Sequence, residues 1–317
     1  MGEPACGFFA PRSHDLIPLP EQGCRIQRDD SRAATQAVLA WMKQSGARAY
    51  DEVTGKGLVR HIMTRSTTSG RLMVVLVATQ RQLPKKDLLI SLLQKAVPGL
   101  VSLCLSVNNR RTNVILGEEI HTLWGEAVME DTLHGLKFSV SPLSFFQVNP
   151  VQTEKLYQLA LDYAQLTGEE TVVDAYCGAG TISLMLAQKA KKVIGIEIVE
   201  PAIRNANENA ARNGIKNAEF IVGATEDVLP DLIAGGMRPD VIVVDPPRKG
   251  CEEAVLEAII QSRSERVVYV SCGAQTLARD AKILCEGGYR AEKVQCVDMF
   301  CWTGAVETVM LFSKLEA

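Results

Sequence analysis

Two side chains in the second half of the chain have the reactivity expected of a nucleophile and a base. Cys272 directly follows an apolar run at 266–271 that predicts a strand, and Glu307 lies in the last predicted strand, at 306–313. All four histidines precede residue 135, so a nucleophile, acid or base in the second half must be cysteine, aspartate, glutamate or lysine. A thiol and a carboxylate together suit covalent catalysis, in which the thiolate attacks and the carboxylate moves a proton. The alternative for Cys272 is a buried structural thiol, and for Glu307 a solvated charge at a strand edge.

A glycine-containing loop, DAYCGAG at 174–180, follows the first predicted strand of this half. Gly178 and Gly180 let the backbone approach a ligand where a parallel sheet reverses its strand order. Glu197 ends the next predicted strand, nineteen residues after Gly178, where a carboxylate can accept both hydroxyls of a ribose. Ser183 replaces the third glycine of a dinucleotide fingerprint, which disfavours NAD and favours a nucleoside without a pyrophosphate, with S-adenosyl-L-methionine as the obvious candidate. An ordinary strand-to-helix turn is the alternative.

The sequence DPPR at 245–248 ends the fourth predicted strand, at the same edge of the sheet. Two prolines after Asp245 make a rigid loop that can hold a planar base or a methyl donor. Many enzymes that methylate exocyclic amines have an aromatic residue after the prolines, where this chain has Arg248. An amine methyltransferase is therefore disfavoured, and it would leave Cys272 without a role.

One reaction needs a thiol and a carboxylate together. C5 of uracil is a weak nucleophile, but a thiolate that adds at C6 gives C5 carbanion character. After methyl transfer a base must remove the C5 proton so that the thiol can leave. Neither a metal nor a histidine is required, so we expect no metal site.

The elements that must position these residues alternate between strand and helix from Thr171 onward. Such alternation predicts an α/β domain with a parallel sheet covered on both faces. Two final strands without an intervening helix, at 290–298 and 306–313, predict that the last strand runs antiparallel at or near an edge. By analogy of fold, this is the seven-stranded sheet of class I (Rossmann-like) methyltransferases.

The first part predicts a smaller α+β domain, so we place the domains at 1–135 and 136–317. We expect a helix at 31–44, a hairpin of 58–66 and 71–79 around Ser69 and Gly70, and a strand at 112–116. A helix at 150–166 leads into the large sheet.

Composition sets the remaining limits. The length of 317 residues suits two domains, and the longest apolar run, 72–78, is too short to cross a membrane. The first twelve residues show no signal peptide, so a cytoplasmic location is the default, and the nine cysteines are then expected to be reduced thiols, metal ligands or nucleophiles. Residues 1–135 carry 16 Lys and Arg against 13 Asp and Glu, which directs any polyanion contact to that half. No obligate protein partner is readable.

The chain resembles the RNA uracil-C5 methyltransferases, which make 5-methyluridine in tRNA and 23S rRNA, and most closely the bacterial 23S rRNA branch. The resemblance is carried by FFQVN at 145–149, DAYCGAG, IGIE ending at Glu197, DPPRKG at 245–250, VSC followed by TLARD at 276–280, and VET at 306–308. It implies that Cys272 is the nucleophile, that Glu307 is the base and that the partner is RNA. It also implies that the residues in contact with S-adenosyl-L-methionine are Gln147, Tyr176, Glu197 and Asp245.

The chain departs from that family at several positions. Gly273-Ala274 replaces the usual Asn-Pro after the nucleophile, and Ala305 replaces the usual histidine two residues before the base. Most members begin with an RNA-binding β-barrel, and many hold an iron–sulfur cluster of which Cys24 resembles the last ligand. We therefore expect residues 1–135 to begin with a remnant of that region. A non-catalytic RNA-binding or RNA-remodelling remnant of the family is the alternative function.

Overall fold

The computed structural model describes residues 3–20, 23–144 and 146–316. The chain forms two compact units, one of Met1–Asp131 with Ser139–Leu143 and one of Thr132–Phe138 with Ser144–Ala317. The boundary that we placed between residues 135 and 136 falls inside a hairpin formed by β7 (Met129–Leu133) and β8 (Leu136–Val140). Each unit contains a hydrophobic core of its own and is described by itself.

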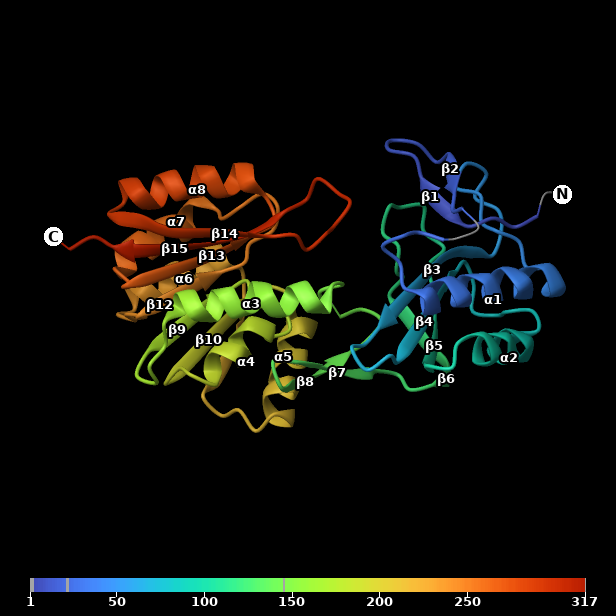
Figure 1. The fold of residues 1–317 in the computed structure, drawn as a ribbon, viewed down its shortest axis with the longest axis horizontal. Coiled ribbons are helices and arrows are strands. Elements are labelled where there is room, and N and C mark those ends of the chain that lie inside the picture. The colour runs from blue at the N-terminus through green and yellow to red at the C-terminus, as the bar shows by residue number, and fades with distance from the viewer. Residues whose placement is uncertain (1–2, 21–22, 145, 317) are drawn as a thin grey trace. The chain divides into compact units, whose positions relative to one another are not determined.

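The first unit contains a four-stranded sheet with the strand order β3-β4-β5-β6 (Figure 1). β4 is buried along its whole length, which explains why its sequence LMVVLVA is apolar at every position instead of alternating. Two helices bury their apolar side chains in one core, which includes the fully buried Trp41. The elements are β1 (Gly7–Phe9), β2 (Leu16–Pro18), α1 (Asp29–Ser45), β3 (Val59–Ser66), β4 (Leu72–Ala78), α2 (Lys86–Ala96), β5 (Leu100–Val107) and β6 (Glu119–Gly125).

The structure confirms the predicted hairpin and corrects one predicted strand of this unit. β3 and β4 pair antiparallel across the turn at 67–71. The strand expected at 112–116 is a loop, and the fourth strand of the sheet is β6, further along the chain. The Asn108 side chain explains the difference, because its amide donates to the carbonyls of Val114 and Ile115 at 2.7 and 3.0 Å. Those carbonyls are thus occupied by a local side chain rather than by a neighbouring strand.

The second unit has a seven-stranded sheet with the order β11-β10-β9-β12-β13-β15-β14. Its first five strands are parallel, and β15 lies antiparallel between β13 and β14, as expected for a last strand near an edge. The strand order reverses between β9 and β12, which makes their carboxyl ends the switch point of the sheet. The strands are β9 (Thr171–Ala175), β10 (Lys192–Glu197), β11 (Ala218–Val222), β12 (Val241–Val244), β13 (Arg266–Ser271), β14 (Tyr289–Val297) and β15 (Glu307–Lys314).

Helices α3 to α8 cover the two faces of this sheet (Figure 1). One core gathers α3, α4 and part of α5, and a second core gathers α6, α7 and α8. Asn149 caps α3 by accepting the backbone N–H of Gln152, and Pro150 fills the first helical position, where no N–H is needed. The helices are α3 (Pro150–Ala164), α4 (Thr181–Ala187), α5 (Glu200–Arg212), α6 (Thr225–Ala234), α7 (Glu253–Ser262) and α8 (Ala274–Glu286).

Candidate active site

Two antiparallel strands bring the predicted nucleophile and base to one place. Cys272 follows the last residue of β13, and Glu307 is the first residue of β15. Ser271 pairs with Thr308 at the end of this ladder, and continuing the register by one residue places Cys272 beside Glu307, whose carboxylate raises the pKa of the Cys272 thiol. Cys272 is half-buried and Glu307 is 5% exposed. The thiol and the carboxyl therefore share one partly enclosed site at the carboxyl end of β13.

Burial and neighbouring charges control the ionisation of this site. Burial raises the pKa of the Cys272 thiol, the carboxylates of Glu307 and Asp245 raise it further, and the Arg248 guanidinium lowers it. Burial also raises the pKa of Glu307, again against the lowering effect of Arg248. Asp245, which follows β12, has its pKa raised to about 8, first by burial and then by Glu307. Ionisation of Glu307 thus makes ionisation of Cys272 and Asp245 less favourable. The positive charge of Arg248 favours the ionised forms of Cys272 and Glu307.

Helix α8 holds the loop that carries Arg248. The Thr276 hydroxyl donates to the carbonyl of Arg248 at 3.2 Å. The Arg279 guanidinium donates to the carbonyls of Lys249 and Cys251 at 3.1 and 3.0 Å. Because α8 begins two residues after Cys272, it links the backbone around this predicted nucleophile to the loop at 246–251. The sequence analysis gave Arg248 no role at the site, since nothing local connects it with Cys272.

Asp280 is the second anchor of that loop, and it is fully buried. Its carboxylate accepts the Cys251 N–H at 2.8 Å, the Tyr269 hydroxyl at 2.7 Å and the Arg279 Nε–H at 2.7 Å. Gly250 has a φ of 79°, and a Cβ there would come within 2.6 Å of an Asp280 carboxylate oxygen. The close contact between the two segments thus explains both Gly250, the glycine of DPPRKG, and Asp280, the aspartate of TLARD.

The two glycines of the loop at 174–180, Gly178 and Gly180, have different surroundings and different structural roles. Gly178 has a φ of 55°, and a Cβ there would meet no atom within 4 Å, so open space lies beside its backbone. Gly180 has a φ of 78°, but a Cβ there would come within 3.1 Å of Ala206 and the Phe220 ring. Gly178 thus fits the close approach of a ligand, whereas Gly180 allows α4 to pack closely beside its neighbours.

Glu197 and Tyr176 flank this loop. The two carboxylate oxygens of Glu197 accept the N–H groups of Gly178 at 3.1 Å and Val199 at 2.9 Å, so the side chain ties β10 to the loop. Each oxygen can accept a second hydrogen bond. Tyr176 has a φ of 69°, and its pKa is raised by burial and by Cys251, which places its hydroxyl near the 246–251 loop. The backbone of Tyr176 borders the crevice while its side chain reaches the neighbouring loop.

Two further buried groups, Tyr157 and Asp174, lie near the site, and the sequence analysis gave neither of them a role. Gln147 hydrogen-bonds the hydroxyl of Tyr157 on α3, and the pKa of Tyr157 is raised by burial and by Asp245. Asp174 is fully buried at the end of β9 and accepts the Ser183 hydroxyl, and burial raises its pKa to about 7. Ser183, which occupies the position of the third glycine in a dinucleotide fingerprint, thus hydrogen-bonds Asp174. Phe145, which begins the FFQVN run, lies outside the described residues.

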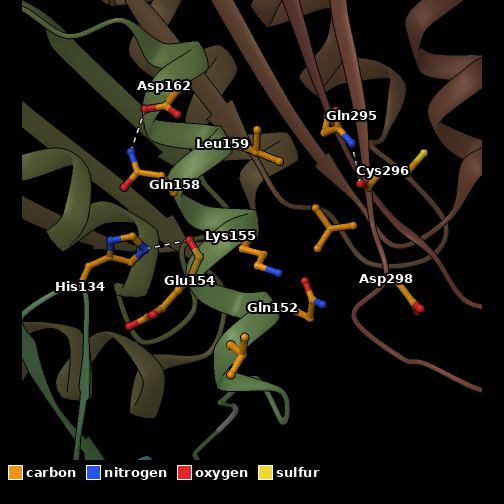
Figure 2. A pocket seen from close by; sticks show the side chains of 12 residues that line it. His134, Gln152, Glu154, Lys155, Gln158, Leu159, Asp162, Gln295, Cys296 and Asp298 are labelled. Atoms are coloured by element: carbon orange, nitrogen blue, oxygen red, sulfur yellow. Dashed lines mark hydrogen bonds between the residues drawn. The ribbon is translucent and has the colours of Figure 1, made fainter.

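A separate groove of about 630 Å³ lies between α3 and β14 (Figure 2). None of the eight predicted site residues lines it. His134 Nε2 lies 2.9 Å from the Glu154 carbonyl oxygen, and Gln158 donates to Asp162 at 2.7 Å on the helix side of the groove. The predicted nucleophile and base are therefore not among the residues that line this groove.

The described part of the chain shows no group of three or more histidine, cysteine, aspartate or glutamate side chains that could hold a metal ion. No helix within residues 3–20, 23–144 and 146–316 is long and apolar enough to cross a bilayer. Cys6 and Cys24 are both free thiols in the structure.

Comparison with known proteins identifies the family. The model of the tRNA (uracil-5-)-methyltransferase family matches residues 21–315. An uncharacterized RNA methyltransferase of Clostridium acetobutylicum is 48% identical over 316 residues, which are 99% of this chain and 68% of the relative. One of Listeria innocua is 50% identical over 313 residues, 98% of this chain and 68% of the relative. The Pyrococcus abyssi tRNA (uracil-54, C5)-methyltransferase, solved with S-adenosyl-L-homocysteine, superposes with a TM-score of 0.81 at 26% identity, over 96% of this chain and 72% of that one. This likeness confirms the methyltransferase fold, and the chain belongs to the tRNA (uracil-5-)-methyltransferase family.

Proposed function

We propose that this RNA (uracil-C5) methyltransferase modifies a uridine of 23S ribosomal RNA through a covalent adduct on Cys272. The observation that supports the mechanism is the strand register, which ends at the Ser271–Thr308 pair and so leaves Cys272 and Glu307 as the next residues at the end of the ladder, with the Glu307 charge acting on the Cys272 thiol. The 23S target rests on the resemblance of the sequence motifs to the ribosomal-RNA branch. The family gives the coarser activity, methylation of uracil in RNA.

The residues at the carboxyl edge of the sheet fit S-adenosyl-L-methionine, which supplies the methyl group as a sulfonium when bound. The open space beside Gly178 admits a ligand next to the backbone of the loop. Glu197 has acceptor capacity left for ribose hydroxyls at the end of β10. We assign Gln147, Tyr176, Gly178, Gly180, Glu197 and Asp245 to this site, with Gly180 acting through packing rather than contact.

The chain's own residues carry the reaction on the base. The Cys272 thiolate forms a bond with C6 of uracil, and the electron pair of the C5–C6 double bond moves to give C5 carbanion character. C5 then receives the methyl group. The Glu307 carboxylate takes the proton from C5, the double bond re-forms and the sulfur leaves C6 with its electron pair. Arg248 supports both ends of this cycle because its charge favours the ionised thiol and the ionised carboxyl.

Transfer of a labelled methyl group tests the proposal. We expect label in 23S rRNA transcripts and not in tRNA, and we expect Cys272→Ser to lower kcat by about 10³-fold or more, the order seen when a covalent nucleophile is removed. Label in tRNA alone would overturn the rRNA target but not the mechanism. A serine variant that methylates at the wild-type rate would overturn the mechanism. No label in any RNA would favour the non-catalytic alternative.

A further inference from the structure

The loop between β14 and β15 exposes a tryptophan, Trp302, five residues before the proposed base Glu307. Trp302 is 83% exposed, whereas Trp41 is fully buried and donates its indole N–H to the Pro84 carbonyl at 3.0 Å. Exposure of an indole to this degree is costly, because an aromatic side chain of this size normally contributes a large buried apolar area. Packing within the folded core therefore does not explain the position of the Trp302 side chain.

The loop is ordered in a way that holds the indole outward. Met299 is 1% exposed and packs in the core, and its carbonyl accepts the Asn149 side-chain amide at 3.1 Å. Beyond it, the backbone N–H and the hydroxyl of Thr303 both donate to the Phe300 carbonyl, at 3.1 and 2.7 Å. The Ala305 N–H in turn donates to the Thr303 hydroxyl at 3.1 Å. The residues on both sides of Trp302 are thus anchored.

The backbone of Trp302 itself is in an unfavourable conformation. Its φ is 69°, in the left-handed region, which is a genuine outlier for a bulky residue. Such outliers persist only where the surrounding structure over-determines them, and they cluster at functional sites. Both the exposure and the backbone of Trp302 therefore act against stability in the free protein.

The loop belongs to the same edge of the sheet as the nucleophile. Trp302 lies five residues before Glu307, which begins β15 beside Cys272. The loop from β14 to β15 extends past the end of the sheet in Figure 1. The exposed indole therefore belongs to the loop that leads directly into the strand of Glu307.

We propose that Trp302 stacks on an unpaired RNA base next to the target uridine and so holds the substrate at the site. The proposal rests on the proposed function, in that the substrate is RNA. Proteins that read single-stranded RNA commonly stack splayed bases on aromatic side chains. Stacking is sequence-tolerant because every base has a π face, so Trp302 contributes affinity for an unpaired neighbour rather than a choice of base.

Tryptophan fluorescence of the 317-residue chain tests the contact itself. We expect a single-stranded RNA oligonucleotide to quench the emission of the wild type, and the same RNA as a duplex to quench it much less. Trp302→Phe, which keeps a ring but removes this emitter, should lose the RNA-dependent change while the signals of Trp41 and Trp124 remain. Equal responses of wild type and Trp302→Phe would overturn the proposal, whether or not the protein methylates RNA.

Kinetics test its consequence for the reaction. Trp302→Ala should raise KM for RNA about tenfold or more, the order lost when a stacking aromatic is removed, and leave kcat within about twofold. Trp302→Phe should retain most of the affinity. Val294→Ala is the control, because Val294 is 61% exposed on β14 and away from the loop. A Trp302→Ala variant with the KM of that control would contradict the proposal, and failure of the wild type to methylate any RNA would instead contradict the proposed function.

Discussion

Glu307 allows the attack by the thiol to be separated from the removal of the C5 proton. Glu307→Gln keeps the shape of a side chain that is 5% exposed but removes the proposed base. We expect methyl transfer to proceed once and the cycle to stop, because the S–C6 bond breaks only after the C5 proton leaves. The RNA–protein adduct should survive a denaturing gel. The double variant with Cys272→Ser should show no adduct, and an adduct in that variant would exclude Cys272 as the attachment point.

Arg248 is the residue whose charge should set the reactivity of Cys272. Its guanidinium lowers a thiol pKa that burial and two carboxylates raise, so Arg248→Gln should raise the pKa further and slow alkylation of Cys272 at any fixed pH below it. The rate of iodoacetamide modification is measured at a series of pH values by mass spectrometry of the peptide that contains Cys272. The midpoint of the rate against pH gives the pKa of the thiol. Arg248→Lys keeps the charge and should stay near the wild type. A midpoint unchanged in Arg248→Gln would show that the charge does not act on the thiol.

Among the elements, α8 has two structural roles, since it begins two residues after Cys272 and holds the 246–251 loop. Asp280→Ala removes the acceptor of three hydrogen bonds and leaves buried donors on Cys251 and Tyr269 unpaired. We expect a loss of about 2–4 kcal/mol in the free energy of unfolding, measured in urea. Lys282→Ala breaks only the exposed 3.8 Å pair with Glu286 on the same helix and should change stability by less than about 1 kcal/mol. Equal losses in the two variants would contradict the anchoring role of Asp280.

For the whole molecule, the acidic site should cost stability at neutral pH. The folded protein raises the pKa of Asp245 from 3.8 to about 8, so the folded state holds a proton that the unfolded chain has released above pH 4. Because the folded pKa is the higher one, the contribution of Asp245 to the free energy of unfolding is fully present below about pH 4. It is lost as the pH rises to about 8, where the folded protein must bury the charged carboxylate. Asp245→Asn should therefore increase the free energy of unfolding by about 1–2 kcal/mol at pH 8 and by much less at pH 5. Asp231→Asn, at an exposed position of α6, is the control. A gain independent of pH would contradict the argument.

The sequence determined the parts of this protein that depend on local pattern. Continuous apolar runs alternating with helical stretches predict a parallel sheet, because a strand buried on both faces cannot alternate. The same pattern places Cys272 and Asp245 at carboxyl ends of strands, where an open α/β sheet binds its ligands. The structure confirms the seven-stranded sheet and the antiparallel last strand.

Only the tertiary structure decided which residues face one another. The insertion of β15 between β13 and β14 brings Glu307 beside Cys272, and no local period encodes that neighbour or its register. The segment 112–116, expected as a strand, is a loop because the Asn108 side-chain amide hydrogen-bonds the backbone carbonyls of Val114 and Ile115. The contact of Asp280 with the loop at Gly250 joins segments about thirty residues apart. Such contacts depend on how buried groups find partners across the fold, which is a property of packing rather than of sequence spacing.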